Sequence, residues 1–223
     1  MKTTIRPFLA LALAAAFAAP AQADSVRFET KASPSSQFSR SVSLPDVPDI
    51  PPSAGLVPLA LSIVPPAQFP GEDWDVFGVR VNLFVGHHRD VAFIDVGGFG
   101  NIADGNLSGV EVGGLYNRVG SSDGAIQIAG IYNGVLGDFC GVQATFLVND
   151  VGGDMEGLQA GAVNLAEDGA GIQLGLFNRA ERFAGLQIGL ANYAYQLQGL
   201  QIGLFNVIED SNVPFMPILN AAF

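Results

Sequence analysis

The chain has 223 residues, 49% of them hydrophobic, and carries 21 acidic against 10 basic residues, which gives a net charge of −11. The acidic excess excludes nucleic acid as a partner, because phosphate backbones are bound through lysine and arginine. The single cysteine, Cys140, excludes an intramolecular disulfide, so packing and hydrogen bonds must stabilise the fold.

Residues 1–23 have the pattern of a secretory signal peptide. Lys2 and Arg6 precede an apolar run over residues 8–19, and the small-residue sequence Ala-Gln-Ala ends at Ala23. The run is shorter than the roughly 20 residues that a membrane-spanning helix needs. We therefore expect cleavage after Ala23 and export across the inner membrane, to the periplasm, the outer membrane or the cell surface.

The next two segments differ sharply in composition. Residues 24–53 are rich in serine and proline, a composition that favours a flexible, solvated leader. Residues 54–76 begin with an apolar stretch that ends at Pro65-Pro66, which predicts an N-terminal strand or cap. The remaining residues, 77–223, form the predicted repeat domain.

The repeat domain is defined by one recurring pattern. The sequences GIQLGLFN, GLQIGLAN and GLQIGLFN start at residues 171, 185 and 199, fourteen residues apart. Fixed-period similarity indicates stacked supersecondary units. Aliphatic residues alternate with glycine or glutamine, which predicts one strand per repeat. The connections of six to eight residues are too short for crossover helices.

Two all-β architectures fit these repeats. In a β-solenoid of about nine to ten coils of 14–16 residues, Leu186, Ile188 and Leu190 would fill the interior. In an up-and-down antiparallel β-barrel of the outer membrane, the same residues would face lipid. Connections of similar length, one tryptophan and short strands favour the solenoid. The terminal Phe223 after an apolar strand favours the barrel, which keeps a small pore or scaffold as the alternative function.

Stacking in register predicts two structural ladders, in which each amide side chain bonds its copy in the next coil. The expected glutamine ladder comprises Gln127, Gln143, Gln159, Gln173, Gln187 and Gln201. The expected asparagine ladder comprises Asn117, Asn133, Asn149, Asn164, Asn178, Asn192, Asn206 and Asn220.

The sequence offers no catalytic residues, metal ligands or cofactor site, so we expect no enzyme activity. His87-His88 is predicted to lie in a solvated turn between strands, and Cys140 to be a small packed side chain. Acidic pairs such as Glu167-Asp168 are predicted to be solubilising turns. The Gly-x-Gln-x-Gly side of each repeat is expected to form either a close-packed wall or a flat exposed surface that docks a glycan or another sheet.

At these residues the chain resembles the bacterial surface-repeat family first named from leptospiral proteins, whose members carry runs of G-[LVI]-Q-[IL]-[GA]-L-x-N. The resemblance covers the chain from about Val57 to Phe223 and includes the C-terminal segment Pro214–Asn220. It implies an exported envelope or surface protein with a structural or binding role. The implied partners are an envelope glycan or a protein, with association with the outer membrane possible.

Overall fold

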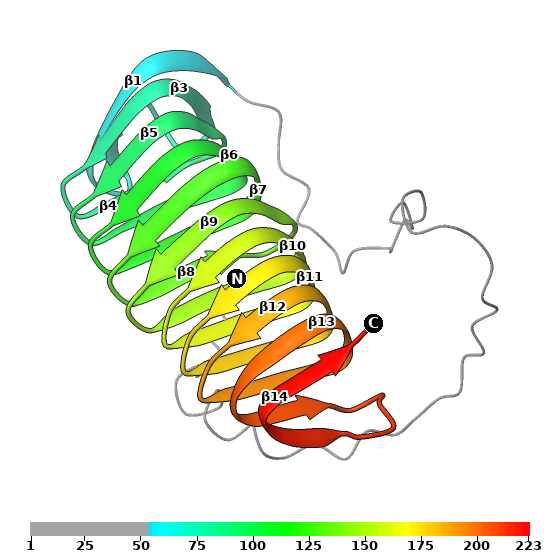
Figure 1. Ribbon diagram of the computed structural model, residues 1–223. Coiled ribbons are helices and arrows are strands. Elements are labelled where there is room, and N and C mark those ends of the chain that lie inside the picture. The colour runs from blue at the N-terminus through cyan, green and yellow to red at the C-terminus, as the bar shows by residue number, and fades with distance from the viewer. Residues whose placement is uncertain (1–53) are drawn as a thin grey trace, which may run out of the picture. The chain divides into compact units, whose positions relative to one another are not determined.

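The computed structural model describes residues 54–223. The predicted signal peptide (1–23) and leader (24–53) lie outside the described residues. Residues 54–223 form a β-solenoid of about 10 turns and not a barrel, which confirms the preferred architecture and corrects the alternative (Figure 1). Over this range no helix is long and apolar enough to cross a membrane.

Nearly every coil contributes to one continuous sheet. The strands are β1 (Gly55–Val64), β2 (Ala67–Phe69), β3 (Trp74–Asn82), β4 (Val85–His88), β5 (Val91–Gly97), β6 (Gly100–Gly113), β7 (Tyr116–Ala129), β8 (Tyr132–Val135), β9 (Phe139–Thr145), β10 (Val148–Ala160), β11 (Val163–Leu174), β12 (Phe177–Ile188), β13 (Ala191–Ile208) and β14 (Phe215–Ala222). Thus the predicted first strand exists, as β1.

Equivalent residues of successive coils are paired in parallel. For example, Asn149 of β10 pairs with Asn164 of β11, and Gln159 of β10 pairs with Gln173 of β11. Only the terminal strands β2 and β14 are antiparallel to their neighbours in the described sheet. Each rung therefore lies about 4.8 Å from the next, as in any sheet.

The sequence-based assignment of the inside and the outside was wrong. Gln187 and Asn192 are 0% and 1% exposed, whereas Ile188 and Leu190 are 37% and 41% exposed. Strict alternation shows that a strand has two different faces, but it does not show which face is buried. Amides that bond their copies lose little when they leave water, so the ladder side of the strand lies inside.

Apolar side chains complete the interior opposite the glutamines. One column contains Leu107, Phe139, Met155 and Phe183, all nearly inaccessible to solvent. Gly169 occupies the rung between Met155 and Phe183, and a Cβ there would lie 3.0 Å from the Phe183 ring. The missing side chain makes room for the ring, as close packing requires.

The glycine that opens each repeat is required by the backbone. Gly171 has φ +131° and Gly185 has φ +140°, values that L side chains rarely adopt. A Cβ on Gly185 would also overlap the carbonyl oxygen of Gly171 in the preceding coil. This glycine column therefore bends most coils at the same place. In β5 the position is occupied by Phe93, which also has a positive φ of 89°.

The C-terminal strand departs from the repeat. We expected Asn220 to extend the asparagine ladder, but β14 runs antiparallel to β13 and pairs Asn220 with Gln201. The reversal follows the irregular residues 209–214, which turn the chain back along β13. β14 therefore caps the stack and is not a further coil.

Candidate functional site: buried ladders and an apolar outer face

The glutamine column is a continuous hydrogen-bonded ladder. Gln143 Nε2 donates to Gln127 Oε1 at 2.9 Å, and Gln187 Nε2 donates to Gln173 Oε1 at 2.7 Å. Gln159, Gln173 and Gln201 each donate to the preceding glutamine in the same way. All six side chains are fully buried.

The asparagine column forms a second ladder and also ties each coil together. Asn164 Nδ2 donates to Asn178 Oδ1 at 2.8 Å and to the Leu174 carbonyl at 2.8 Å. Across the coil, Gln159 Nε2 donates to the Leu165 carbonyl at 3.1 Å. The ladder from Asn117 to Asn206 is unbroken, with Asn117, Asn133, Asn149, Asn178 and Asn192 bonded alike.

The two ladders point in opposite directions. Every glutamine donates toward the N-terminal end of the stack, and every asparagine donates toward the C-terminal end. Their aligned amide dipoles therefore oppose each other along the axis. The donor end of the glutamine ladder meets an acid, since Gln127 Nε2 donates to Glu111 Oε2 at 2.8 Å.

The first rungs of the glutamine column are charged. Arg80, Asp95 and Glu111 occupy consecutive rungs that lead to Gln127, and all three are 0% exposed. Arg80 donates through Nε to Asp95 Oδ1 at 2.7 Å and through Nη2 to Asp95 Oδ2. The Arg80 Nη2 atom lies 3.9 Å from Glu111 Oε1. Arg80 and Asp95 stand where later coils have glutamine, and their ion pair was not predicted.

Burial and the neighbouring Asp95 carboxylate raise the pKa of Glu111 well above 4.5, although Arg80 and Gln127 lower it. A protonated Glu111 leaves the buried Arg80 and Asp95 as a neutral pair. Among the described residues, Glu111 Oε1 lacks a hydrogen-bond partner. Desolvation of the carboxylate is thus the dominant effect at this rung.

His88 does not lie in a solvated turn, which corrects the prediction for the histidine pair. It is 0% exposed on β4, and its Nδ1 lies 3.2 Å from Arg80 Nη1. Burial, and then Arg80, lowers the pKa of His88 from 6.5 to about 4. His87 stays at the surface, where its Nε2 lies 2.8 Å from Asp104 Oδ2. The period-2 pattern of β4 turns one histidine inward and the other outward.

The residues on either side of each glutamine form an apolar outer face. The column before the glutamines contains Val79, Ile94, Val110, Ile126, Val142, Leu158, Ile172, Leu186 and Leu200, and the column after them contains Val81, Val96, Val112, Ile128, Ala144, Ala160, Leu174, Ile188 and Ile202. We call these eighteen residues the apolar face. None is charged, and Ile126 and Ile128 are 42% and 43% exposed.

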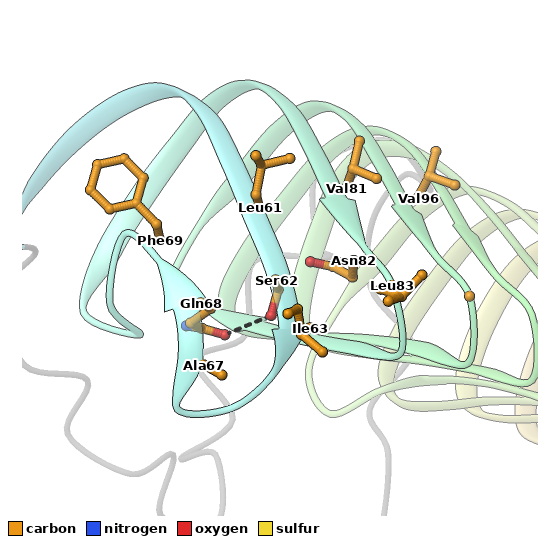
Figure 2. A pocket seen from close by; sticks show the side chains of 11 residues that line it. Leu61, Ser62, Ile63, Ala67, Gln68, Phe69, Val81, Asn82, Leu83 and Val96 are labelled. Atoms are coloured by element: carbon orange, nitrogen blue, oxygen red, sulfur yellow. Dashed lines mark hydrogen bonds between the residues drawn. The ribbon is translucent and has the colours of Figure 1, made fainter.

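The apolar face ends in a hollow at the N-terminal coils. Figure 2 shows Leu61, Val81 and Val96 on adjacent strands with Phe69 of β2 beside them. The hollow has a volume of about 700 Å³. At its edge Ser62 Oγ donates to Gln68 Oε1 at 3.2 Å. It continues the apolar face and adds no charged group.

Exposed acidic side chains lie in the part of each coil between the asparagine and glycine columns. They include those of Asp104, Asp138 and Asp154. Asp168 accepts a hydrogen bond from Arg182 Nε at 2.7 Å. Each coil thus has amides inside, aliphatic residues outside on both sides of the glutamine position, and carboxylates in the stretch that leads from the asparagine to the glycine.

The structure brings together two buried amide ladders, a buried ion pair and an exposed aliphatic surface. The described part of the chain contains no cluster of three or more potential metal ligands. Cys140 is partly buried and unpaired. The Gly-x-Gln-x-Gly side is buried and is not the exposed docking surface that we considered. The surface available for docking is the aliphatic one, which the sequence analysis had placed in the core.

Comparisons with known proteins found no match. No family model fits the chain, and neither the curated proteins nor the solved structures contain a significant relative.

Proposed function

We propose that this chain is an exported protein of the bacterial cell envelope that serves as a structural or binding module and not as an enzyme. The observation that supports this most is the apolar face, which repeats through successive coils with no charged residue. A reaction centre needs one distinct place on a protein, whereas a face built from equivalent rungs offers the same chemistry along its length.

The chemistry of the face favours a protein partner over a glycan. Glycan recognition uses hydrogen-bonding groups, and the eighteen side chains of the apolar face are valine, isoleucine, leucine and alanine. Large exposed apolar patches are typical of protein or membrane contacts. Export is supported by the pattern over residues 1–23 and by the resemblance to surface-repeat proteins.

Expression of the full chain with a C-terminal tag in a Gram-negative host tests the proposal. We expect the chain in the envelope fraction with Asp24 as its first residue. The double variant Leu11→Asp/Leu13→Asp, which interrupts the apolar run of the signal, should remain uncleaved in the cytosol. An uncleaved wild-type chain in the cytosol would refute the envelope assignment.

A further inference from the structure

We propose that Asn106 is a modification site, the acceptor of an N-linked oligosaccharide. Asn106, Leu107 and Ser108 form the one place in the sequence where asparagine is followed, two residues later, by serine or threonine. With a middle residue other than proline, this pattern marks the acceptor of N-glycosylation in exported proteins. The inference rests on the proposed export, because the transfer takes place outside the cytosol.

The structure separates Asn106 from the other asparagines. The chain contains twelve asparagines, and ten of them are buried, with exposures of 2% or less. The two exposed ones are Asn106 and Asn212. Asn212 is followed by Val213 and Pro214, so it lacks the hydroxyl residue that the pattern requires. The one asparagine with the acceptor pattern is therefore also one of the two that an enzyme can reach.

Asn106 lies at a corner of its coil and not in the middle of a regular strand. β6 pairs with β4 up to Ala103 and with β5 from Leu107 onward. Residues 104–106 therefore face the turn between β4 and β5. The register of β6 against β7 is also interrupted between Ala103 and Asn106. Irregular surface segments of this kind are where modifying enzymes and ligands find access to a folded chain.

The side chains around the acceptor are arranged for recognition from solvent. Asp104, Asn106 and Ser108 are exposed, whereas Gly105 and Leu107 between them are buried. The period of two residues in a strand therefore points a carboxylate, an amide and a hydroxyl outward in one row. An enzyme that binds this row meets the hydroxyl that defines the acceptor pattern on one side and an ionic contact on the other.

The chemistry is a substitution at a sugar carbon. Asn106 Nδ2 attacks C1 of the first sugar of a polyprenyl diphosphate-linked oligosaccharide, and a C–N bond forms. The bond from C1 to the diphosphate oxygen breaks, the diphosphate leaves with the electron pair, and one Nδ2 proton passes to a base of the transferase. In the fold, Ser121 Oγ donates to Asn106 Oδ1 at 3.4 Å. This contact engages the oxygen of the amide and leaves the nitrogen available.

The surroundings of Asn106 suit a hydrophilic oligosaccharide. Asn106 lies in the stretch between the asparagine and glycine columns, where Asp104, Asp138 and Asp154 are also exposed. A glycan attached there extends into water, as surface glycans do. The apolar face, which follows the glycine column in each coil, remains uncovered for its own partner.

Transfer to the purified chain tests the proposal. The chain from Asp24 to Phe223, which retains every described residue, is incubated with a bacterial oligosaccharyltransferase and its lipid-linked oligosaccharide. We expect the intact mass to rise by the mass of one oligosaccharide, with the modification on the peptide that contains Asn106. Asn106→Gln should abolish the transfer, and Ser108→Ala should lower its rate by about tenfold or more. The matched control is Asn212→Gln, which removes the other exposed asparagine and should leave the rate within about twofold of the wild type.

A second variant separates recognition from folding. Ser108→Thr keeps the hydroxyl and should retain the transfer that Ser108→Ala loses, while circular dichroism establishes that each variant is folded. A wild-type chain that gains no oligosaccharide overturns the proposal, as does an Asn106→Gln chain that is still modified. Equal losses in Asn106→Gln and Asn212→Gln overturn it as well. The purified chain bypasses export, so failure of this transfer is distinguishable from failure of signal cleavage in the full chain.

Discussion

The two ends of the glutamine column show two ways to bury polar groups. From Gln127 to Gln201 every rung is neutral, and each amide up to Gln187 both donates to one neighbour and accepts from the other, so further rungs can be added. From Arg80 to Glu111 the rungs are ionisable, and each depends on a neighbour of opposite charge or on a proton. The amide part is therefore extensible, whereas the charged part is a single arrangement whose stability depends on pH.

The largest expected effect is at the charged end. Asp95→Leu removes the bidentate partner of Arg80 and leaves a buried guanidinium whose nearest carboxyl oxygen is Glu111 Oε1 at 3.9 Å. We expect the free energy of unfolding at pH 7, measured by urea denaturation, to fall by about 3–5 kcal/mol. The double variant Arg80→Leu/Asp95→Leu should lose less, because it leaves no unpaired charge. If the single variant lost less unfolding free energy than the double variant, the buried ion pair would be contradicted.

Interrupting the glutamine ladder should lower the free energy of unfolding by less than breaking the ion pair does. Gln173→Leu leaves Gln159 Oε1 without its donor and removes the side-chain acceptor of Gln187 Nε2. We expect a loss of about 2–3 kcal/mol in the urea unfolding free energy, since each unpaired buried group costs about 1–3 kcal/mol.

The matched control for this variant is Gln198→Leu. Gln198 is an exposed glutamine of β13, and the same exchange there should change the unfolding free energy by no more than about 0.5 kcal/mol. Similar losses at Gln173 and Gln198 would show that the ladder contributes nothing to stability.

Converting a charged rung into an amide rung should stabilise the fold. Glu111→Gln keeps an acceptor for Gln127 Nε2 and abolishes the cost of ionising a buried carboxyl. Because the folded-state pKa of Glu111 lies above 4.5, its contribution to stability is present below pH 4.5 and is lost as the pH rises through that folded-state pKa.

We expect Glu111→Gln to gain about 1 kcal/mol at pH 8 and much less at pH 4, as measured by urea unfolding. An equal gain at both pH values would mean that Glu111 does not carry the proton.

The sequence predicted the fold but not which face of each strand is buried. Repeat spacing and alternation predicted stacked parallel rungs, because a fixed repeat length places equivalent residues of successive coils side by side. Hydropathy then placed Leu186 and Ile188 inside, although the core in this fold is selected by copy-to-copy hydrogen bonding. One internal signal distinguishes the faces. The glutamine column is invariant from Gln127 to Gln201, whereas the neighbouring aliphatic position varies from Ile128 to Ala144.

The ion pair at the charged end of the glutamine column could have been predicted from the sequence. Arg80 and Asp95 stand at the glutamine position of adjacent coils, and opposite charges on consecutive buried rungs predict a pair. His88 could not have been placed, because the turn boundary decides which of two adjacent histidines points inward. The reversal of β14 was also hidden, since Asn220 stands in phase with Asn206 in the sequence yet pairs with Gln201.

A last effect concerns His88, whose contribution to stability should depend on pH in the sense opposite to that of Glu111. The pKa of His88 falls from 6.5 to about 4 on folding, so its neutral form is the buried one. Its contribution to stability is complete above pH 6.5 and is lost as the pH falls from about 6.5 to about 4. His88→Val places in this column the residue that Val119 and Val135 provide in later coils. Between pH 7 and pH 4.5, we expect the free energy of unfolding of the wild type, measured in urea, to fall by about 1–2 kcal/mol more than that of the variant. Parallel pH profiles for the two proteins would mean that His88 is already protonated in the fold, in which case Arg80 would need a second carboxylate and Glu111 would have to be ionised.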